Sequence, residues 1–93
     1  MARPYKDRVC YDYMIQSVCF SDRYYVGFTE DLRKRLAAHN AGKNKSTAAS
    51  KPWKLIGYIA FEEKRRALAF EAYLKTALGR AFTKKRLWRS EKN

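Results

Sequence analysis

The chain has 93 residues, enough for one domain with a small core, and apolar residues make up 46% of it. Its 21 Lys and Arg against 9 Asp and Glu give a formal net charge of +12, more than solubility alone requires, so a polyanionic partner is favoured. No segment approaches the roughly 18 consecutive apolar residues that span a bilayer, and the first residues lack the apolar core of a signal peptide, so we expect a cytoplasmic protein without a membrane partner.

The first half of the chain predicts an antiparallel hairpin followed by a helix. Residues 11–17 alternate aromatic or aliphatic side chains with others, as a strand does, and residues 23–28 form a second aromatic run. The pair Ser21-Asp22 between them is a turn signal. Thr29 is the expected N-cap of a helix that runs to about Asn40, with Gly42 just beyond its end.

The second half predicts one more strand and two helices. Residues 43–52 are basic and small, which indicates a mobile loop, and residues 53–61 are a third strand. A helix is expected from Glu62 or Glu63 to Leu78, with Gly79 ending it, and a short helix over 82–88. The predicted fold class is α/β (α+β): a small, three-stranded, mainly antiparallel sheet flanked by helices, in the order ββαβαα. Residues 1–93 form a single domain with its core at about 10–88 and loose ends at 1–9 and 89–93.

Three charged or titratable side chains lie on helix faces that should pack against the sheet. Arg35 and His39 share a face with the leucines of the first helix, and Glu71 lies at the margin of the apolar stripe of the second. A charge that faces a core must be paired or bound. One reading is an Arg35–Glu71 ion pair that fastens the two helices together, and the other is a polar cleft above a tyrosine-rich strand.

The second reading suits cleavage of a phosphodiester bond. An arginine stabilises the negative charge that develops on phosphorus, and a carboxylate holds a divalent metal. A phenol or an imidazole can accept the proton of an attacking water. Because a lone tyrosine has a pKa near about 10, the phenol would need neighbouring positive charge to lower its pKa.

These residues resemble the GIY-YIG nuclease family. Two short tyrosine motifs, Tyr11-Asp12-Tyr13 and Tyr25-Val26-Gly27, are separated by 11 residues in this chain, close to the family's spacing. The run from Phe28 to Asn40 is similar to the family's first helix, with its arginine and trailing His-Asn, and the run from Phe70 to Lys75 is similar to the helix that presents the metal-binding glutamate. Residues 51–55 and 79–87 are similar to the entry to the third strand and to the ending of short, stand-alone members.

The resemblance implies an endonuclease that hydrolyses nucleic acid, DNA more than RNA, in repair or recombination. It implies one divalent metal, Mg²⁺ or Mn²⁺, on Glu71, and charge stabilisation by Arg35. One motif tyrosine, near Arg35 and the metal, is expected to have a lowered pKa and to accept a proton from water, directly or through His39, while the other positions the water. We favour Tyr13 as the acceptor and Tyr25 as the positioning group. Gly27 either admits backbone close to the site or allows tight packing of strand and helix.

Three departures from the family pattern leave open an alternative, a nucleic-acid-binding module of the same family with weak or no catalysis, although the main site residues are all present. Tyr11 replaces the glycine of the first motif, and Phe28 stands where the excision-repair branch often has lysine. Thr83 and Arg86 stand where many members have an asparagine after the glutamate.

A domain of this size is expected to bind nucleic acid with its own basic surface, or with a protein partner that supplies specificity. The expected phosphate-binding residues are Lys34, Lys43, Lys45, Lys51, Lys54, Lys84, Lys85 and Arg86. Cys10 and Cys19 form no CxxC pair with each other, and the single histidine lies 20 residues past Cys19, so a zinc site is not expected and both cysteines should be reduced.

Overall fold

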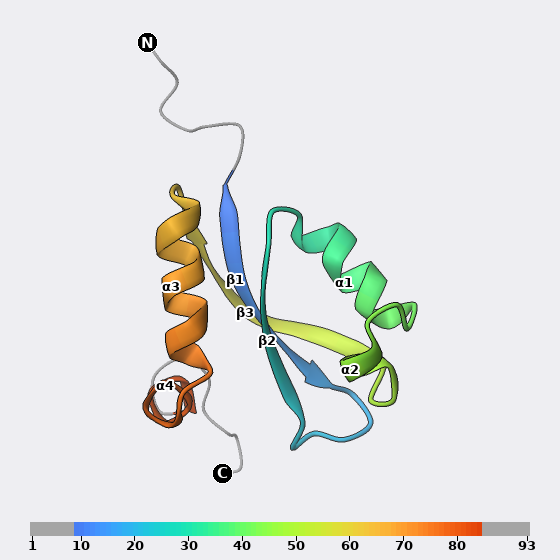
Figure 1. Ribbon diagram of the computed structural model, residues 1–93. Helices are drawn as coiled ribbons and strands as arrows, with labels where there is room; N and C mark the ends of the chain where they lie inside the picture. Colours follow the sequence, from blue (N-terminus) through green and yellow to red (C-terminus); the bar gives the residue numbers. More distant parts are fainter. Residues whose placement is uncertain (1–8, 85–93) are drawn as a thin grey trace.

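The computed structural model describes residues 9–84, which form a three-stranded sheet with helices on both sides (Figure 1). The strands are β1 (Cys10–Ser17), β2 (Tyr24–Thr29) and β3 (Trp53–Phe61). The helices are α1 (Leu32–Asn40), α2 (Lys45–Ala48), α3 (Lys64–Leu74) and α4 (Ala77–Phe82). The predicted fold class is therefore confirmed, with α2 as an addition. No helix within residues 9–84 combines the length and apolarity needed to cross a membrane.

The strand order is β2-β1-β3, and both neighbours of the central strand are antiparallel to it. Tyr13 is paired with Gly27 on β2, and Ile15 is paired with Tyr25. Because directly paired residues point to the same side of a sheet, both motif tyrosines lie on one face. The pairing with β3 contains a bulge at the step from Met14 to Ile15. The antiparallel hairpin predicted from the first two strands is confirmed.

Helices α1 and α2 cover one face of the sheet, and α3 and α4 lie on the opposite side (Figure 1). On the α1 side the buried cluster consists of Tyr13, Ile15 and Trp53, against which Tyr25, Leu32 and Leu36 pack. On the other side, Ala67 and Leu74 are the buried residues of α3. The core is thus split between two thin layers, which is typical of so small a domain.

Helix α1 begins two residues later than predicted. The carboxylate of Asp31 accepts a hydrogen bond from the backbone N–H of Lys34 at 3.0 Å, so Asp31 and not Thr29 is the N-cap. The Thr29 hydroxyl accepts from the backbone N–H of Asp31 and stabilises the turn before the helix. At the other end, Gly42 has a φ of 77°, the left-handed conformation predicted for it.

The segment 43–52 is an ordered connection and not the predicted loop without structure. Asn44 caps α2 by accepting from the backbone N–H of Ser46, and Thr47 and Ser50 are buried. The indole N–H of Trp53 donates to the Thr47 carbonyl at 2.9 Å, and the Ser17 hydroxyl donates to the Ser50 carbonyl at 2.7 Å. These bonds hold α2 against the ends of β1 and β3.

The prediction of one helix up to Leu78 is wrong, because α3 ends at Leu74 and a separate helix, α4, begins at Ala77. The Thr76 hydroxyl accepts from the backbone N–H of Gly79 and caps α4. Gly79 lies inside α4, where a Cβ would overlap the backbone of Tyr73. The glycine therefore allows α4 to fold back tightly on α3, and Leu78 is 74% exposed instead of buried. A short helix was predicted over residues 82–88, and its part from Lys85 onward lies outside the described residues.

Candidate active site

The side chain of Tyr13 lies across the backbone of Gly27 on the neighbouring strand. A Cβ at Gly27 would lie 2.6 Å from Cζ of the Tyr13 ring and would also overlap its hydroxyl. The glycine therefore leaves room for the ring to extend over β2. The contact observed at Gly27 differs from both expected roles, because the group that packs against the glycine is the Tyr13 ring.

A chain of hydrogen bonds connects Tyr13 to α1 and α2. The Arg35 Nε–H donates to the Tyr13 hydroxyl oxygen at 3.1 Å, and this oxygen lies 2.7 Å from Nε2 of His39. On the far side of the imidazole, Nδ1 lies 2.8 Å from the Thr47 hydroxyl oxygen. Tyr13, His39 and Thr47 are all at most 2% exposed. The structure thus brings Tyr13, Arg35 and His39 together, as predicted from the sequence. It also adds Thr47, which was not predicted to be part of the site.

Burial sets the protonation states in this chain. Desolvation raises the pKa of the Tyr13 phenol above its ordinary value, although the neighbouring Arg35 guanidinium acts to lower it. The lowered pKa was expected for a phenol beside both Arg35 and a bound metal ion, so it stays a prediction. Burial and the charge of Arg35 lower the pKa of His39. The Tyr13 hydroxyl raises the pKa of Arg35, so near pH 7 a charged guanidinium faces a neutral phenol and a neutral imidazole.

Tyr25 packs beside these groups, and its ring centroid lies 5.0 Å from that of His39 and 6.4 Å from that of Tyr13. On its other side, the Lys75 ammonium lies 5.8 Å from the ring centroid. Lys75 also forms an ion pair with Glu71, at 3.1 Å between Nζ and Oε2. Tyr25 therefore lies between the α1 side of the site and the carboxylate on α3.

The Glu71 side chain is 19% exposed, consistent with its predicted place at the margin of the helix face. Its ion-pair partner is Lys75, while Arg35 donates to Tyr13. The alternative of an Arg35–Glu71 ion pair is therefore wrong. The negative charge of Glu71 raises the pKa of Tyr13 slightly, which indicates that the carboxylate is within electrostatic range of the phenol.

The donor set fits a metal ion that is held largely by water and substrate. Within residues 9–84, no group of three His, Cys, Asp or Glu side chains is placed to enclose a metal. Mg²⁺ is usually bound by one or two carboxylates together with phosphate oxygens and waters, so a single accessible carboxylate is sufficient. Glu71 meets this requirement, provided that the half-exposed Lys75 side chain moves aside.

Asp12 is a buried carboxylate that the sequence analysis did not single out. It is 0% exposed, and neither oxygen has a hydrogen-bond partner among the described residues. Burial, followed by the negative charge of Glu71, raises its pKa from 3.8 to about 7. The alternation of β1 had already placed Asp12 on the face opposite Tyr13, but only the packing of α3 over that face makes it buried.

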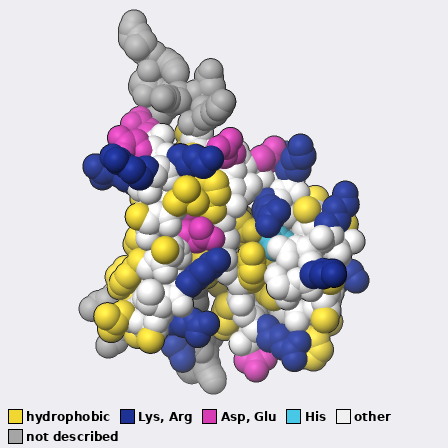
Figure 2. All heavy atoms as spheres, viewed as in Figure 1, with side chains coloured by type: hydrophobic (Ala, Val, Ile, Leu, Met, Phe, Trp, Pro, Cys, Tyr) yellow, Lys and Arg dark blue, Asp and Glu magenta, His cyan; other side chains and the backbone are white. Residues whose placement is uncertain are grey.

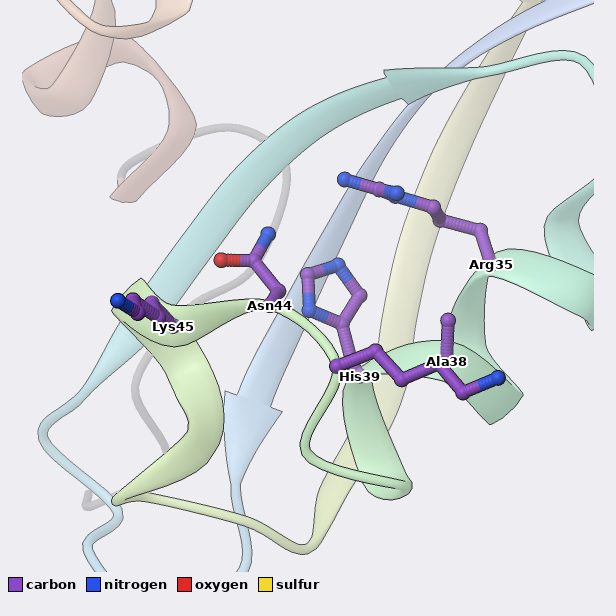
Figure 3. Close-up of a pocket in the computed structure, with 6 residues that line it drawn as sticks. Arg35, Ala38, His39, Asn44 and Lys45 are labelled. Atoms are coloured by element: carbon purple, nitrogen blue, oxygen red, sulfur yellow. The ribbon is translucent and has the colours of Figure 1, made fainter.

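A cavity of about 320 Å³ opens next to the Tyr13–His39 pair, and Arg35, Ala38, His39, Lys43, Asn44 and Lys45 line it. Figure 3 shows the Arg35 and His39 side chains entering it from α1, with Asn44 and Lys45 on the opposite wall. Basic side chains are spread over the α1–α2 half of the surface (Figure 2). Two of the predicted phosphate-binding lysines, Lys43 and Lys45, therefore lie beside the candidate site.

The other predicted basic contacts are more scattered. The described ones are exposed and lie on α1, before and within β3, and after α4: Lys34, Lys51, Lys54 and Lys84. Lys85 and Arg86 lie outside the described residues. Thr83, at one of the positions where the family often has asparagine, is buried, and its hydroxyl donates to the Arg80 carbonyl at 3.0 Å.

The chain is similar to known proteins over most of its length. Residues 9–86 match the family described as the GIY-YIG catalytic domain. A UPF0213 protein of Streptococcus pneumoniae serotype 4 is 44% identical over 70 residues, which are 74% of this chain and 69% of the relative. One from Streptococcus pyogenes serotype M3 is 44% identical over 64 residues, 68% and 70% of the two chains. The solution structure of UPF0213 protein BH0048 from Bacillus halodurans has a TM-score of 0.48 and 26% identity, over 78% of this chain and 79% of that one.

The buried Asp12 carboxylate predicts a dependence of stability on pH. Its folded-state pKa of about 7 lies above the value of 3.8 that applies when it is exposed, so the folded protein binds more protons between these values. The contribution of Asp12 to stability is therefore full below about pH 4 and is lost as pH rises to about 7. Asp12→Val should raise the free energy of unfolding at pH 8 by more than about 1–3 kcal/mol, the usual cost of an unsatisfied neutral polar group, because the buried carboxyl is ionised at that pH.

Urea unfolding at pH 4.5 and pH 8 measures this difference, with Asp12→Asn as the control that removes the charge and keeps the polar group. Both variants should lose most of the pH dependence between these two values, and only Asp12→Val should gain stability at both. An unchanged pH dependence in both variants would show that Asp12 is not the buried acid.

Proposed function

The chain belongs to the GIY-YIG nuclease domain family, and we propose that it is a metal-dependent endonuclease that hydrolyses phosphodiester bonds in DNA, with a role in repair or recombination. The observation that carries the proposal is the buried Tyr13 hydroxyl, which lies between the guanidinium of Arg35 and the neutral imidazole of His39. A purely structural core gains nothing from three such groups in one hydrogen-bonded line, because each must be desolvated to reach it.

Charge stabilisation is the role of Arg35. Its Nε–H is used by the Tyr13 hydroxyl, so contact with substrate falls to the two terminal nitrogens of the guanidinium, which lies beside Tyr25 at the wall of the cavity. Those nitrogens can donate to two oxygens of one phosphate, the forked contact that arginine makes and lysine does not. As negative charge builds up on the equatorial oxygens, these bonds strengthen.

The proton of the attacking water takes a path through two side chains. Tyr13 holds its own proton at neutral pH, so it can accept another only if the first leaves at the same time. His39 Nε2, 2.7 Å away, is the acceptor for that proton. The water gives its proton to the Tyr13 oxygen, Tyr13 passes its proton to His39, and the hydroxide oxygen forms a bond to phosphorus as the bond to the leaving oxygen breaks. Tyr25, half-buried between Tyr13 and Lys75, orients the water by hydrogen bonding.

Glu71 is the residue that would hold the divalent metal, Mg²⁺ or Mn²⁺. The metal, when bound, shields the charge of the phosphate and of the departing oxygen. The position of Glu71 beyond Tyr25, on the side away from Arg35, supports this role, because the substrate phosphate then lies between two positive centres. Lys75 balances the carboxylate before substrate and metal arrive.

DNA binding is proposed for the cavity and the basic residues around it. With a net charge of +12, most of the affinity should come from release of counterions, independently of sequence. The cavity brings Lys43 and Lys45 next to Arg35, so these two lysines are placed to hold phosphates adjacent to the scissile one. No base-reading element accompanies them in residues 9–84, which supports selection by DNA structure or by a partner protein.

Removal of the Glu71 carboxylate should abolish cleavage and leave DNA binding intact. Glu71→Gln keeps the shape of the side chain but lacks the charge that a divalent ion needs. Cleavage of plasmid, branched DNA, single strands and RNA, with Mg²⁺ or Mn²⁺ and with a chelator, gives the rate, and fluorescence anisotropy gives the affinity.

The matched control is Glu63→Gln, which removes an exposed carboxylate at the start of the same helix. It should cut like the wild type. Equal rates for wild type and Glu71→Gln would rule out Glu71 as the metal site. A wild-type protein that binds DNA but cuts none of these substrates under any metal condition would favour the alternative, a binding module without catalysis.

Replacement of Lys43 and Lys45 should weaken binding through lost phosphate contacts. The double variant Lys43→Ala/Lys45→Ala should lower the slope of log affinity against log salt by about 2, since each phosphate contact contributes about 0.9. The control is Lys64→Ala/Arg65→Ala, which removes the same charge at the start of α3, across the sheet from the cavity (Figure 1). Equal slopes for the two double variants would contradict a phosphate-binding role for the cavity.

A further inference from the structure

The Tyr13 hydroxyl fixes which nitrogen of His39 carries a hydrogen. Among the described residues, two groups lie within hydrogen-bond distance of the Tyr13 oxygen: Arg35 Nε and His39 Nε2. Arginine can only donate, so the phenol proton has one available acceptor, His39 Nε2. A buried hydroxyl proton without an acceptor would be costly. The neutral imidazole is therefore the tautomer with hydrogen on Nδ1.

Thr47 completes this arrangement on the far side of the ring. The Nδ1–H of His39 needs an acceptor, and the Thr47 hydroxyl oxygen lies 2.8 Å away. The Thr47 hydroxyl in turn donates to the Asn44 carbonyl, with 3.4 Å between the two oxygens. In this assignment every hydrogen in the chain points at an acceptor. In the reverse assignment, with hydrogen on Nε2, the Tyr13 proton has no acceptor among residues 9–84.

The surrounding contacts hold the Thr47 hydroxyl in place. Thr47 is 1% exposed, and its own carbonyl accepts from the indole N–H of Trp53. The Asn40 side chain bonds both the N–H and the carbonyl of Trp53, which ties the end of α1 to the start of β3. Helix α1, which carries His39, and helix α2, which carries Thr47, are thereby fixed to the same tryptophan.

We propose that Thr47 is a positioning residue that keeps His39 in the Nδ1–H tautomer, so that Nε2 is free to receive the proton of Tyr13. The catalytic part of this proposal rests on the proposed function, whereas the tautomer itself does not. When His39 takes the proton it becomes an imidazolium with a hydrogen on each nitrogen. Nδ1–H then still donates to Thr47, so the positive ring gains no unsatisfied donor. The Thr47 hydroxyl oxygen therefore accepts a hydrogen bond from Nδ1–H in both the neutral and the charged imidazole.

The chain contains a single histidine, which makes the tautomer directly observable. Nitrogen-15 NMR of the labelled protein at pH 8 distinguishes the protonated from the unprotonated ring nitrogen without assignment of other residues. The wild type should show hydrogen on Nδ1. Thr47→Val, which has the same shape but no acceptor, should shift the population towards the Nε2–H form, and Thr47→Ser should restore the wild-type spectrum.

The same variants test the catalytic consequence. Thr47→Val should lower kcat by about 10-fold or more with little change in KM, because general base catalysis typically contributes about 10²–10⁴-fold. Thr47→Ser should recover most of the rate. Ser46→Ala, which removes the neighbouring hydroxyl of α2, is the control and should change neither the tautomer nor kcat.

Either of two results would overturn the tautomer part of the proposal: a wild-type spectrum with hydrogen on Nε2, or a Thr47→Val variant that keeps the wild-type tautomer. Failure of the proposed function would be distinct, because a protein without nuclease activity could still show the Nδ1–H tautomer and its loss in Thr47→Val. A Thr47→Val variant with a changed tautomer and an unchanged kcat would separate Thr47 from catalysis and contradict the positioning role.

Discussion

The Tyr13 hydroxyl reaches Arg35 and His39 by crossing over Gly27, and this contact determines the shape of the whole site. A side chain on the central strand of a sheet normally stands perpendicular to it and packs against the covering helix. Here the glycine on β2 leaves space beside the strand, and the ring extends through it. Its hydroxyl then forms hydrogen bonds with Arg35 and His39, which lie one turn apart on the face of α1 that packs against the sheet.

The remaining polar groups are arranged around this contact in two directions. Towards α2, the imidazole continues to Thr47, and Trp53 and Asn40 fix that end. Towards α3, Tyr25 and Lys75 lead to Glu71. The α2 side is buried and fully hydrogen-bonded, while the α3 side is more exposed and held by a single ion pair. In the proposed endonuclease, the hydrogen-bonded side would keep the proton path fixed and the ion-paired side would admit the metal.

Much of the fold could be predicted because local patterns and tertiary packing agree. The alternation in β1 and the leucines of α1 correctly placed Tyr13, Arg35 and His39 on facing surfaces. The failures lie where a side-chain hydrogen bond overrides a local pattern. Thr76 starts a new helix within an apolar run that looked continuous, and Asn44 with Thr47 orders a segment whose composition is typical of loops. The spacing of apolar residues does not mark the caps at Thr76 and Asn44, and the bond between Thr47 and His39 depends on the packing of α2 against α1.

Asp12 and Thr47 were missed for the same physical reason: both are short polar side chains whose burial comes from an element distant in sequence. The Arg35–Glu71 pairing was a reasonable interpretation of opposite charges on two helix faces, but the Tyr25 ring on β2 lies between the two side chains. The phenol of Tyr13, which passes over β2, takes the place of the carboxylate as the partner of Arg35.

The most direct test of the site is the removal of one oxygen atom. Tyr13→Phe keeps the ring over Gly27 and deletes the hydroxyl that joins Arg35 to His39. With metal and DNA at saturating concentrations, single-turnover cleavage by this variant should be slower than that of the wild type by about 10²-fold or more, with unchanged DNA affinity and a folded circular dichroism spectrum. Cleavage by Tyr13→Phe at the wild-type rate would show that the phenol carries no proton in the reaction, and would contradict the proton path through Tyr13 and His39.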